Sequence, residues 1–173
     1  VLNYVVRHLD ISGNAARFKF SRPKVSLSAK TSRDGGRDGG RFREDYLMSF
    51  SGAKTATLHL VQQHSIDGQL SPYAPVADIA ASFQDAVTDW LVEKAHLASK
   101  EFGAKAVLMG GGVSANQMLR DKMRHRFGVA VSFPHLALCT DNAAMIGAAG
   151  YQAFLRGIRD DLTLDVAPDL KLG

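Results

Sequence analysis

Hydrophobic residues recur every three or four positions between residues 76 and 102, which predicts one long amphipathic helix. Gly103 follows directly and is a typical signal for the end of a helix. Trp90 lies at the edge of the apolar face, and we interpret it as a core residue rather than as a platform for a ligand. The positions that carry the pattern are Val76, Ile79, Phe83, Val87, Leu91 and Ala95.

Two short apolar runs further along the chain, at residues 106–109 and 129–133, predict strands, and a helical pattern follows each of them. The first of these helices begins at Ser114 and Gln117, which have the spacing of a capping box. The second is predicted over residues 141–157. Alternation of strand and helix is the order found in a parallel α/β layer, and this is the fold class we predict.

The amino-terminal half is less regular. Residues 1–10 have the spacing of a helix, whereas the apolar positions of residues 56–61 fit either a helix or a strand. Residues 28–45 contain a tandem Arg-Asp-Gly-Gly repeat and too few hydrophobic side chains to order themselves, so we expect a mobile, basic, glycine-rich loop. The turn residues Asp67 and Gly68 predict a second loop before the long helix.

Positive charge is concentrated around the glycine-rich repeat. Nine Lys or Arg and two Asp lie between residues 17 and 43, a local net charge of +7 in a chain whose total is +4. Such a segment suggests a polyanionic partner, with nucleic-acid phosphate as the obvious class. A solvated insertion without any partner is the alternative interpretation.

The single cysteine, Cys139, excludes an internal disulfide and any metal site built from several thiolates. It favours a reducing compartment, the cytoplasm, and its apolar surroundings favour a packed small side chain over a nucleophile. No apolar run approaches the roughly 18 residues that a membrane helix needs. Because Val1 already stands within an apolar pattern, we expect the chain to be part of a longer protein.

Three consecutive glycines, Gly110, Gly111 and Gly112, separate the first predicted strand from its helix. Glycines at such a turn remove Cβ atoms, so that a phosphate, ribose or purine can approach the backbone N–H groups. Asn116 follows in the first helical turn, where its amide can both donate and accept hydrogen bonds. The alternative is structural, because the same glycines also permit a strand and a helix to pack closely.

Asp141 lies beyond the second predicted strand, directly after Thr140, which we expect to cap the last helix. A carboxylate there interacts favourably with the helix dipole. It also stands at the sheet edge where α/β proteins bind ligands. Small residues along the helix predict close packing that would fix Asp141 rigidly. One carboxylate cannot hold a transition metal alone, and no pair of histidines has HxxxH or HExxH spacing.

Four stretches closely resemble one protein family. They are FSGAKTA at residues 50–56, DIAASFQDAV at 78–87, GGGVSANQMLR at 110–120 and CTDNAAMIGAAG at 139–150. In this order they resemble the TsaD/Gcp family of tRNA N6-adenosine threonylcarbamoyltransferases, formerly called O-sialoglycoprotein endopeptidases or glycoproteases. The resemblance runs over nearly the whole chain.

The resemblance implies an actin-like (ASKHA, ribonuclease H-like) ATPase fold, with this chain as a helix-rich carboxyl-terminal portion holding a small, incomplete sheet. It also implies transfer of threonylcarbamoyl from threonylcarbamoyl-adenylate to N6 of adenosine 37 in tRNA. The implied binding residues for the adenylate, an adenine nucleotide, are Gly110, Gly111, Gly112 and Asn116. Asp141 is the implied ligand of one divalent metal, iron or zinc. The implied partners are tRNA and TsaB-like and TsaE-like proteins.

The family's HxxxH motif and its amino-terminal metal-binding lobe are not found in this chain. We therefore expect residues 1–173 to form a single lobe that is inactive alone and that self-associates through its exposed face. A non-catalytic scaffold module that pairs with a TsaB-like protein is the alternative. A glycoprotease-type metallopeptidase is a weaker one, because the chain has no HExxH motif.

Overall fold

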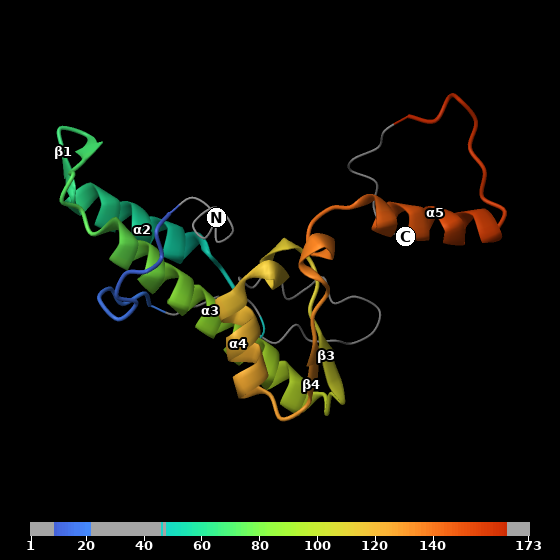
Figure 1. Cartoon of the computed structure of the whole chain (residues 1–173), viewed down its shortest axis with the longest axis horizontal. Helices are drawn as coiled ribbons and strands as arrows, with labels where there is room; N and C mark the ends of the chain where they lie inside the picture. Colours follow the sequence, from blue (N-terminus) through green and yellow to red (C-terminus); the bar gives the residue numbers. More distant parts are fainter. Residues whose placement is uncertain (1–8, 22–45, 47, 166–173) are drawn as a thin grey trace, which may run out of the picture. The chain divides into compact units, whose positions relative to one another are not determined.

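The computed structural model describes residues 9–21, 46 and 48–165 (Figure 1). The chain divides into two compact units, residues 1–139 and 140–173, and each is described by itself. The predicted loop over 28–45 lies outside the described residues. So does the predicted helix over residues 1–10, apart from Leu9 and Asp10, which are not helical. No described helix has the length and apolar character needed to cross a membrane.

The first described helix, α2 (Ser51–Gln63), settles the ambiguity over residues 56–61 in favour of a helix. A hairpin follows it, in which β1 (Ser65–Ile66) pairs antiparallel with β2 (Gln69–Leu70). The predicted turn residues Asp67 and Gly68 do form the turn, and the structure adds the two short paired strands on either side of it. The two turn residues have φ values of 52° at Asp67 and 77° at Gly68, and an Asp-Gly pair suits a tight hairpin turn that needs two positive φ values.

The long helix α3 (Val76–Glu101) confirms the prediction made from periodicity, and Gly103 adopts the left-handed φ of 58° expected beyond a helix end. Its first half packs against α2 in a buried cluster that also holds Trp90, so the interpretation of this residue as core is confirmed. The cluster consists of Ala53, Phe83, Val87 and Trp90.

The segment before α2 is fixed to the start of α3. The backbone N–H of Asn14 donates to Asp78 Oδ1 at 2.6 Å, and Arg17 Nη1 donates to Asp78 Oδ2 at 2.6 Å. These bonds, that from Asn14 above all, hold the pKa of the Asp78 carboxyl below its ordinary value. A Cβ at Gly13 would stand 2.3 Å from the Ala77 carbonyl carbon, so this approach requires glycine.

The second half of α3 supports the predicted parallel layer. Strands β3 (Ala106–Leu108) and β4 (Ala130–Ser132) pair in parallel, and α4 (Gln117–Arg126) connects them and packs on α3 (Figure 1). One face of the pair contributes Val107 and Val131 to a cluster with these helices, whereas Leu108 on the other face is 80% exposed. The buried members of the cluster are Val92, Leu119, Met123 and Phe127.

A polar contact also joins the two helices. Lys122 Nζ on α4 lies 2.7 Å from Asp85 Oδ1 and 2.7 Å from Asp89 Oδ1 on α3, and it donates to Thr88 Oγ1 at 2.9 Å. Because these side chains are partly exposed, each ion pair contributes only about 1 kcal/mol or less. The apolar cluster therefore provides most of the free energy that holds α4 on α3.

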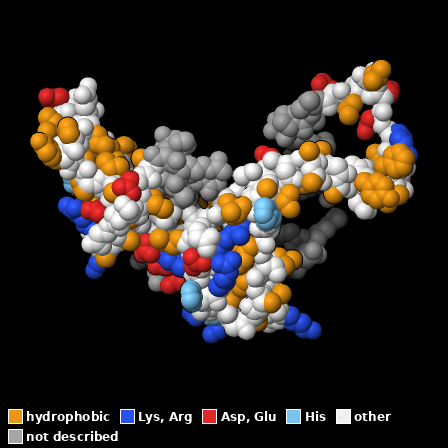
Figure 2. Space-filling view, viewed as in Figure 1, with side chains coloured by type: hydrophobic (Ala, Val, Ile, Leu, Met, Phe, Trp, Pro, Cys, Tyr) orange, Lys and Arg blue, Asp and Glu red, His pale blue; other side chains and the backbone are white. Residues whose placement is uncertain are grey.

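The unit of residues 140–173 contains one described helix, α5 (Ala143–Leu155). None of its residues is buried, and Figure 2 shows hydrophobic side chains along its surface. The predicted close packing of this helix is not found among the described residues, because no atom lies within 4 Å of a Cβ built at Gly147 or Gly150. Exposed apolar side chains here are Met145, Ile146, Tyr151, Phe154 and Leu155.

Replacement of Leu119 by alanine tests the role of the apolar cluster. Leu119 is 0% exposed, so Leu119→Ala leaves a cavity and lowers the free energy of unfolding by about 2–5 kcal/mol, measured by urea denaturation. Leu97→Ala, on the 41% exposed Leu97 of α3, changes it by only about 0.5 kcal/mol. Equal effects of the two substitutions would contradict this assignment of the core.

His96 of α3 makes stability depend on pH. Both of its ring nitrogens are buried and have no hydrogen-bond partner among the described residues, and its ring meets Phe127 edge-on. Burial first, and then the positive charges of Arg126 and Lys100, lower the pKa of His96 below the ordinary 6.5. The folded state therefore binds fewer protons than the unfolded state at mildly acidic pH.

We expect the free energy of unfolding to fall as the pH drops through about 6.5, where unfolded His96 takes up a proton and the folded residue does not. His96→Phe removes this loss and flattens the profile between about pH 7 and 5. His125→Gln, at an exposed histidine, serves as the control and retains the wild-type slope. An unchanged slope in His96→Phe would refute the assignment.

Candidate functional site

The glycine turn, residues 110–116, begins where β3 ends. Met109 extends the pairing through its N–H, which donates to Ser132 O at 3.0 Å, and Gly110 and Gly111 then stand exposed. A short 3-10 helix, η3 (Gly112–Ala115), carries the chain on to α4. Gly111 has φ 77°, in the left-handed region, so the direction of the turn depends on glycine at this position.

The space beside the turn helps to decide whether the glycines serve ligand binding or close packing of strand and helix. A Cβ added at Gly110 or Gly111 would have no atom within 4 Å, so neither glycine is needed for close packing within the described part of the chain. The backbone N–H groups of residues 110–113 likewise have no acceptor among the described residues. Exposed amides beside open space are available to a bound anion or nucleotide.

The residue that caps α4 is Asn116, not Ser114, so the predicted capping box was wrong. Asn116 Oδ1 accepts a hydrogen bond of 2.9 Å from the N–H of Leu119. Ser114 is buried within η3, and its hydroxyl donates to Gly111 O at 2.7 Å, which closes the turn on itself. Asn is as good an N-cap as Ser, and the extra 3-10 turn moves the start of the helix by two residues.

The other end of the Asn116 amide is also bound. Asn116 Nδ2 donates to Gln84 Oε1 on α3 at 3.1 Å, and Asn116 is only 4% exposed. One donor and one acceptor of this amide are thus used to hold α4 and the turn against α3. Gln84 was missed in the sequence analysis, and the polar residue at a buried position of the α3 pattern was the available signal.

Asp141 is exposed and belongs to the second unit, whereas the residues of the turn belong to the first. The predicted cap at Thr140 was wrong, because Asn142 Oδ1 accepts from the N–H of Met145 at 3.0 Å and begins α5. Asp141 thus precedes the helix. No described residue forms a hydrogen bond or an ion pair with its carboxylate, which remains available to a ligand.

The described residues do not by themselves form a metal site. No group of three or more His, Cys, Asp or Glu side chains among them is close enough to hold an ion. Asp141 therefore fits a metal only as one ligand among several, and a transition metal in a protein takes three or four.

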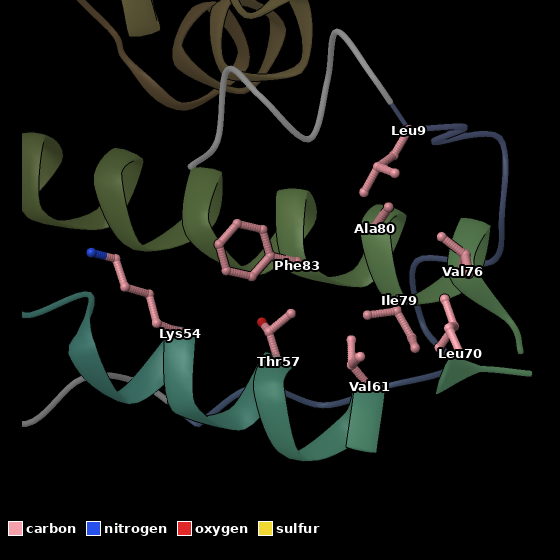
Figure 3. Close-up of a pocket in the computed structure, with 9 residues that line it drawn as sticks. All are labelled: Leu9, Lys54, Thr57, Val61, Leu70, Val76, Ile79, Ala80 and Phe83. Carbon is pink, nitrogen blue, oxygen red and sulfur yellow. The ribbon is translucent and has the colours of Figure 1, made fainter. Parts of the chain in front are cut away.

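A cavity of about 210 Å³ lies elsewhere in the first unit, between α2 and α3. Figure 3 shows the apolar side chains that enclose it, among them Leu9, Val61, Ile79 and Phe83, with the amine of Lys54 directed away from them. None of the predicted site residues lines this cavity, and its walls offer almost no polar group that could orient a substrate.

The chain is similar to proteins of one known family. The sequence model of one protein family, described as TsaD: tRNA N6-adenosine threonylcarbamoyltransferase, matches residues 7–148, which include the turn and Asp141. The chain belongs to this family. Its membership confirms the resemblance of the four sequence stretches, and it places the chain in a family of transferases.

Curated relatives carry the same name. The protein of Symbiobacterium thermophilum is 47% identical over 131 residues, covering 74% of this chain and 37% of the relative. That of Thermomicrobium roseum is 43% identical over 145 residues, covering 75% and 40%. That of Nostoc punctiforme is 40% identical over 171 residues, covering 97% and 45%. The chain thus spans less than half the length of these relatives.

Asn116→Ala removes both the cap of α4 and the bond to Gln84, so we expect the free energy of unfolding to fall by about 1–2 kcal/mol. Asn116→Ser keeps an oxygen that can cap the helix and recovers a large part of this loss. Urea denaturation of the chain measures both values. If the alanine variant were as stable as the wild type, the capping assignment would be wrong.

Proposed function

We propose that the complete protein to which this chain belongs transfers the threonylcarbamoyl group from threonylcarbamoyl-adenylate to N6 of adenosine 37 in tRNA. The observation that carries the proposal is the family match over residues 7–148, which includes a turn whose N–H groups at residues 110–113 have no acceptor among the described residues. In the reaction, the N6 amine attacks the carbamoyl carbon and the bond from that carbon to the phosphate oxygen breaks. AMP leaves, and the amine loses a proton to solvent.

The glycine turn would act in this reaction by holding the leaving group. Backbone N–H groups of Gly110, Gly111 and Gly112 can donate to the phosphate or ribose of the adenylate, and the open space beside Gly110 and Gly111 lets it approach. One hydrogen of the Asn116 amide has no acceptor among the described residues, and we propose that it donates to the adenylate. Such groups accelerate a transfer mainly by positioning its reactants.

Asp141 is proposed as one ligand of a divalent metal, iron or zinc, which would supply Lewis-acid chemistry when bound. Its exposed carboxylate supports this assignment, and the remaining ligands must come from residues outside the described part of this chain. We further propose an actin-like fold for the complete protein, with residues 1–173 in one carboxyl-terminal lobe.

The proposed partners are tRNA and TsaB-like and TsaE-like proteins, and the proposed location is the cytoplasm. The exposed apolar side chains of α5 are consistent with self-association of the separate chain. Alone, the chain should carry out no transfer, because the described residues do not complete a metal site. This leaves the non-catalytic scaffold as the second candidate, whereas no arrangement of described residues favours the metallopeptidase.

The proposal is tested on the complete protein together with its TsaB-like and TsaE-like partners, supplied with threonylcarbamoyl-adenylate and unmodified tRNA, with the modified nucleoside detected by mass spectrometry. Asp141→Ala should abolish metal retention, measured by elemental analysis, and lower the transfer rate by about 100-fold or more. Asp160→Ala, at another exposed aspartate of the same unit, should leave both values unchanged. Full metal content in Asp141→Ala would overturn the ligand assignment, and an inactive wild type would overturn the function.

A further inference from the structure

Arg120 is a buried cation bound to groups of an unusual kind. It lies on α4 and is only 8% exposed, yet the acceptors around it are two backbone carbonyls and a thiol. Its Nε donates to Ser114 O at 2.6 Å, and its Nη2 donates to Pro134 O at 2.8 Å and to Cys139 Sγ at 3.2 Å. A buried charge is costly unless it is hydrogen-bonded, so these contacts are not incidental.

The three acceptors belong to different segments of the first unit. Ser114 closes the glycine turn, and Pro134 follows strand β4. Cys139 is the last residue of the first unit and stands two positions before Asp141 in the sequence. A single planar guanidinium therefore joins the segment that we propose binds the adenylate to the segment that follows β4, both within the first unit.

We propose that Arg120 is a positioning residue for the transfer reaction: it holds the backbone at Ser114 in place, with its guanidinium fixed by Pro134 and Cys139, and thereby keeps the glycine turn in its working conformation. This inference rests on the proposed function. Lysine could not replace Arg120, because a compact ammonium cannot reproduce the fork of donors that reaches three acceptors in different directions.

Arg124 provides a matched control on the same helix. Its Cζ stands 4.9 Å from the centre of the Phe133 ring, and Arg120 Cζ stands 5.1 Å from the same ring. Arg124 is half exposed and pairs with Asp121 at 3.0 Å, but it makes none of the three contacts described above. The two arginines thus share a packing role on Phe133 and differ in their hydrogen bonds.

The experiment compares Arg120→Met, Arg120→Lys and Arg124→Met in the complete protein. Amide hydrogen exchange is followed at residues 111–114 and 138–139, together with the affinity for a non-reactive adenylate analogue. Arg120→Met should speed exchange in both segments and weaken analogue binding, each by about tenfold or more. Arg120→Lys should not restore these values, and Arg124→Met should match the wild type.

Cys139→Ala keeps the inference testable if Arg120→Met fails to fold. It removes one acceptor only, so exchange should rise at residues 138–139 while analogue binding is retained, because the bonds to Ser114 and Pro134 remain. Uniformly faster exchange over α3 and α4 without a specific effect on the two segments would overturn the positioning role. So would full rescue by lysine. If the wild type transfers nothing, the proposed function fails, and the exchange data still decide the role of Arg120.

Discussion

The buried amide of Asn116 is the contact on which the arrangement of the first unit around the glycine turn depends. Its oxygen begins α4 at Leu119, and its nitrogen binds Gln84 in the middle of α3. These two bonds fix the start of α4 on the side of α3, and they therefore hold the turn between β3 and α4 in one position. An amide is suited to this task because it donates and accepts at once.

Arg120 lies one helical turn after Asn116, on the same face of α4, and it binds the backbone of Ser114 in the glycine turn. Asn116 ties the helix to α3, and Arg120 ties the same helix back to Ser114 and forward to Cys139. Gly110 and Gly111, which precede Asn116 and Arg120 in the chain, remain exposed. A rigid frame around an open backbone is what a site needs if it works by positioning.

The stretches that could be predicted from the sequence were those where one local pattern decides the structure. The periodicity of α3 and the parallel β3–β4 layer are cases of this kind, and the burial of Trp90 follows from its place on α3. The helix starts were predicted wrongly, because Ser114, Thr140, Asn116 and Asn142 are all good caps by themselves, and only tertiary packing selects between them.

The candidate site was predicted as a set of residues rather than as an arrangement. The glycines and Asn116 could be singled out from the turn and the family pattern, but the occupation of the Asn116 amide by Gln84 required contacts distant in sequence. Arg120 lay within the recognised stretch at residues 110–120, yet an arginine in a helix usually faces water, and its burial follows from its contacts with Pro134 and Cys139.

A crystal structure of the complete protein with a non-reactive analogue of threonylcarbamoyl-adenylate tests the central claim most directly. The account predicts that the adenylate lies against Gly110–Gly112, within hydrogen-bond distance of their backbone N–H groups, while Asn116 still caps α4. An analogue bound elsewhere, with the amides of the turn bonded only to water or to other parts of the protein, would contradict it.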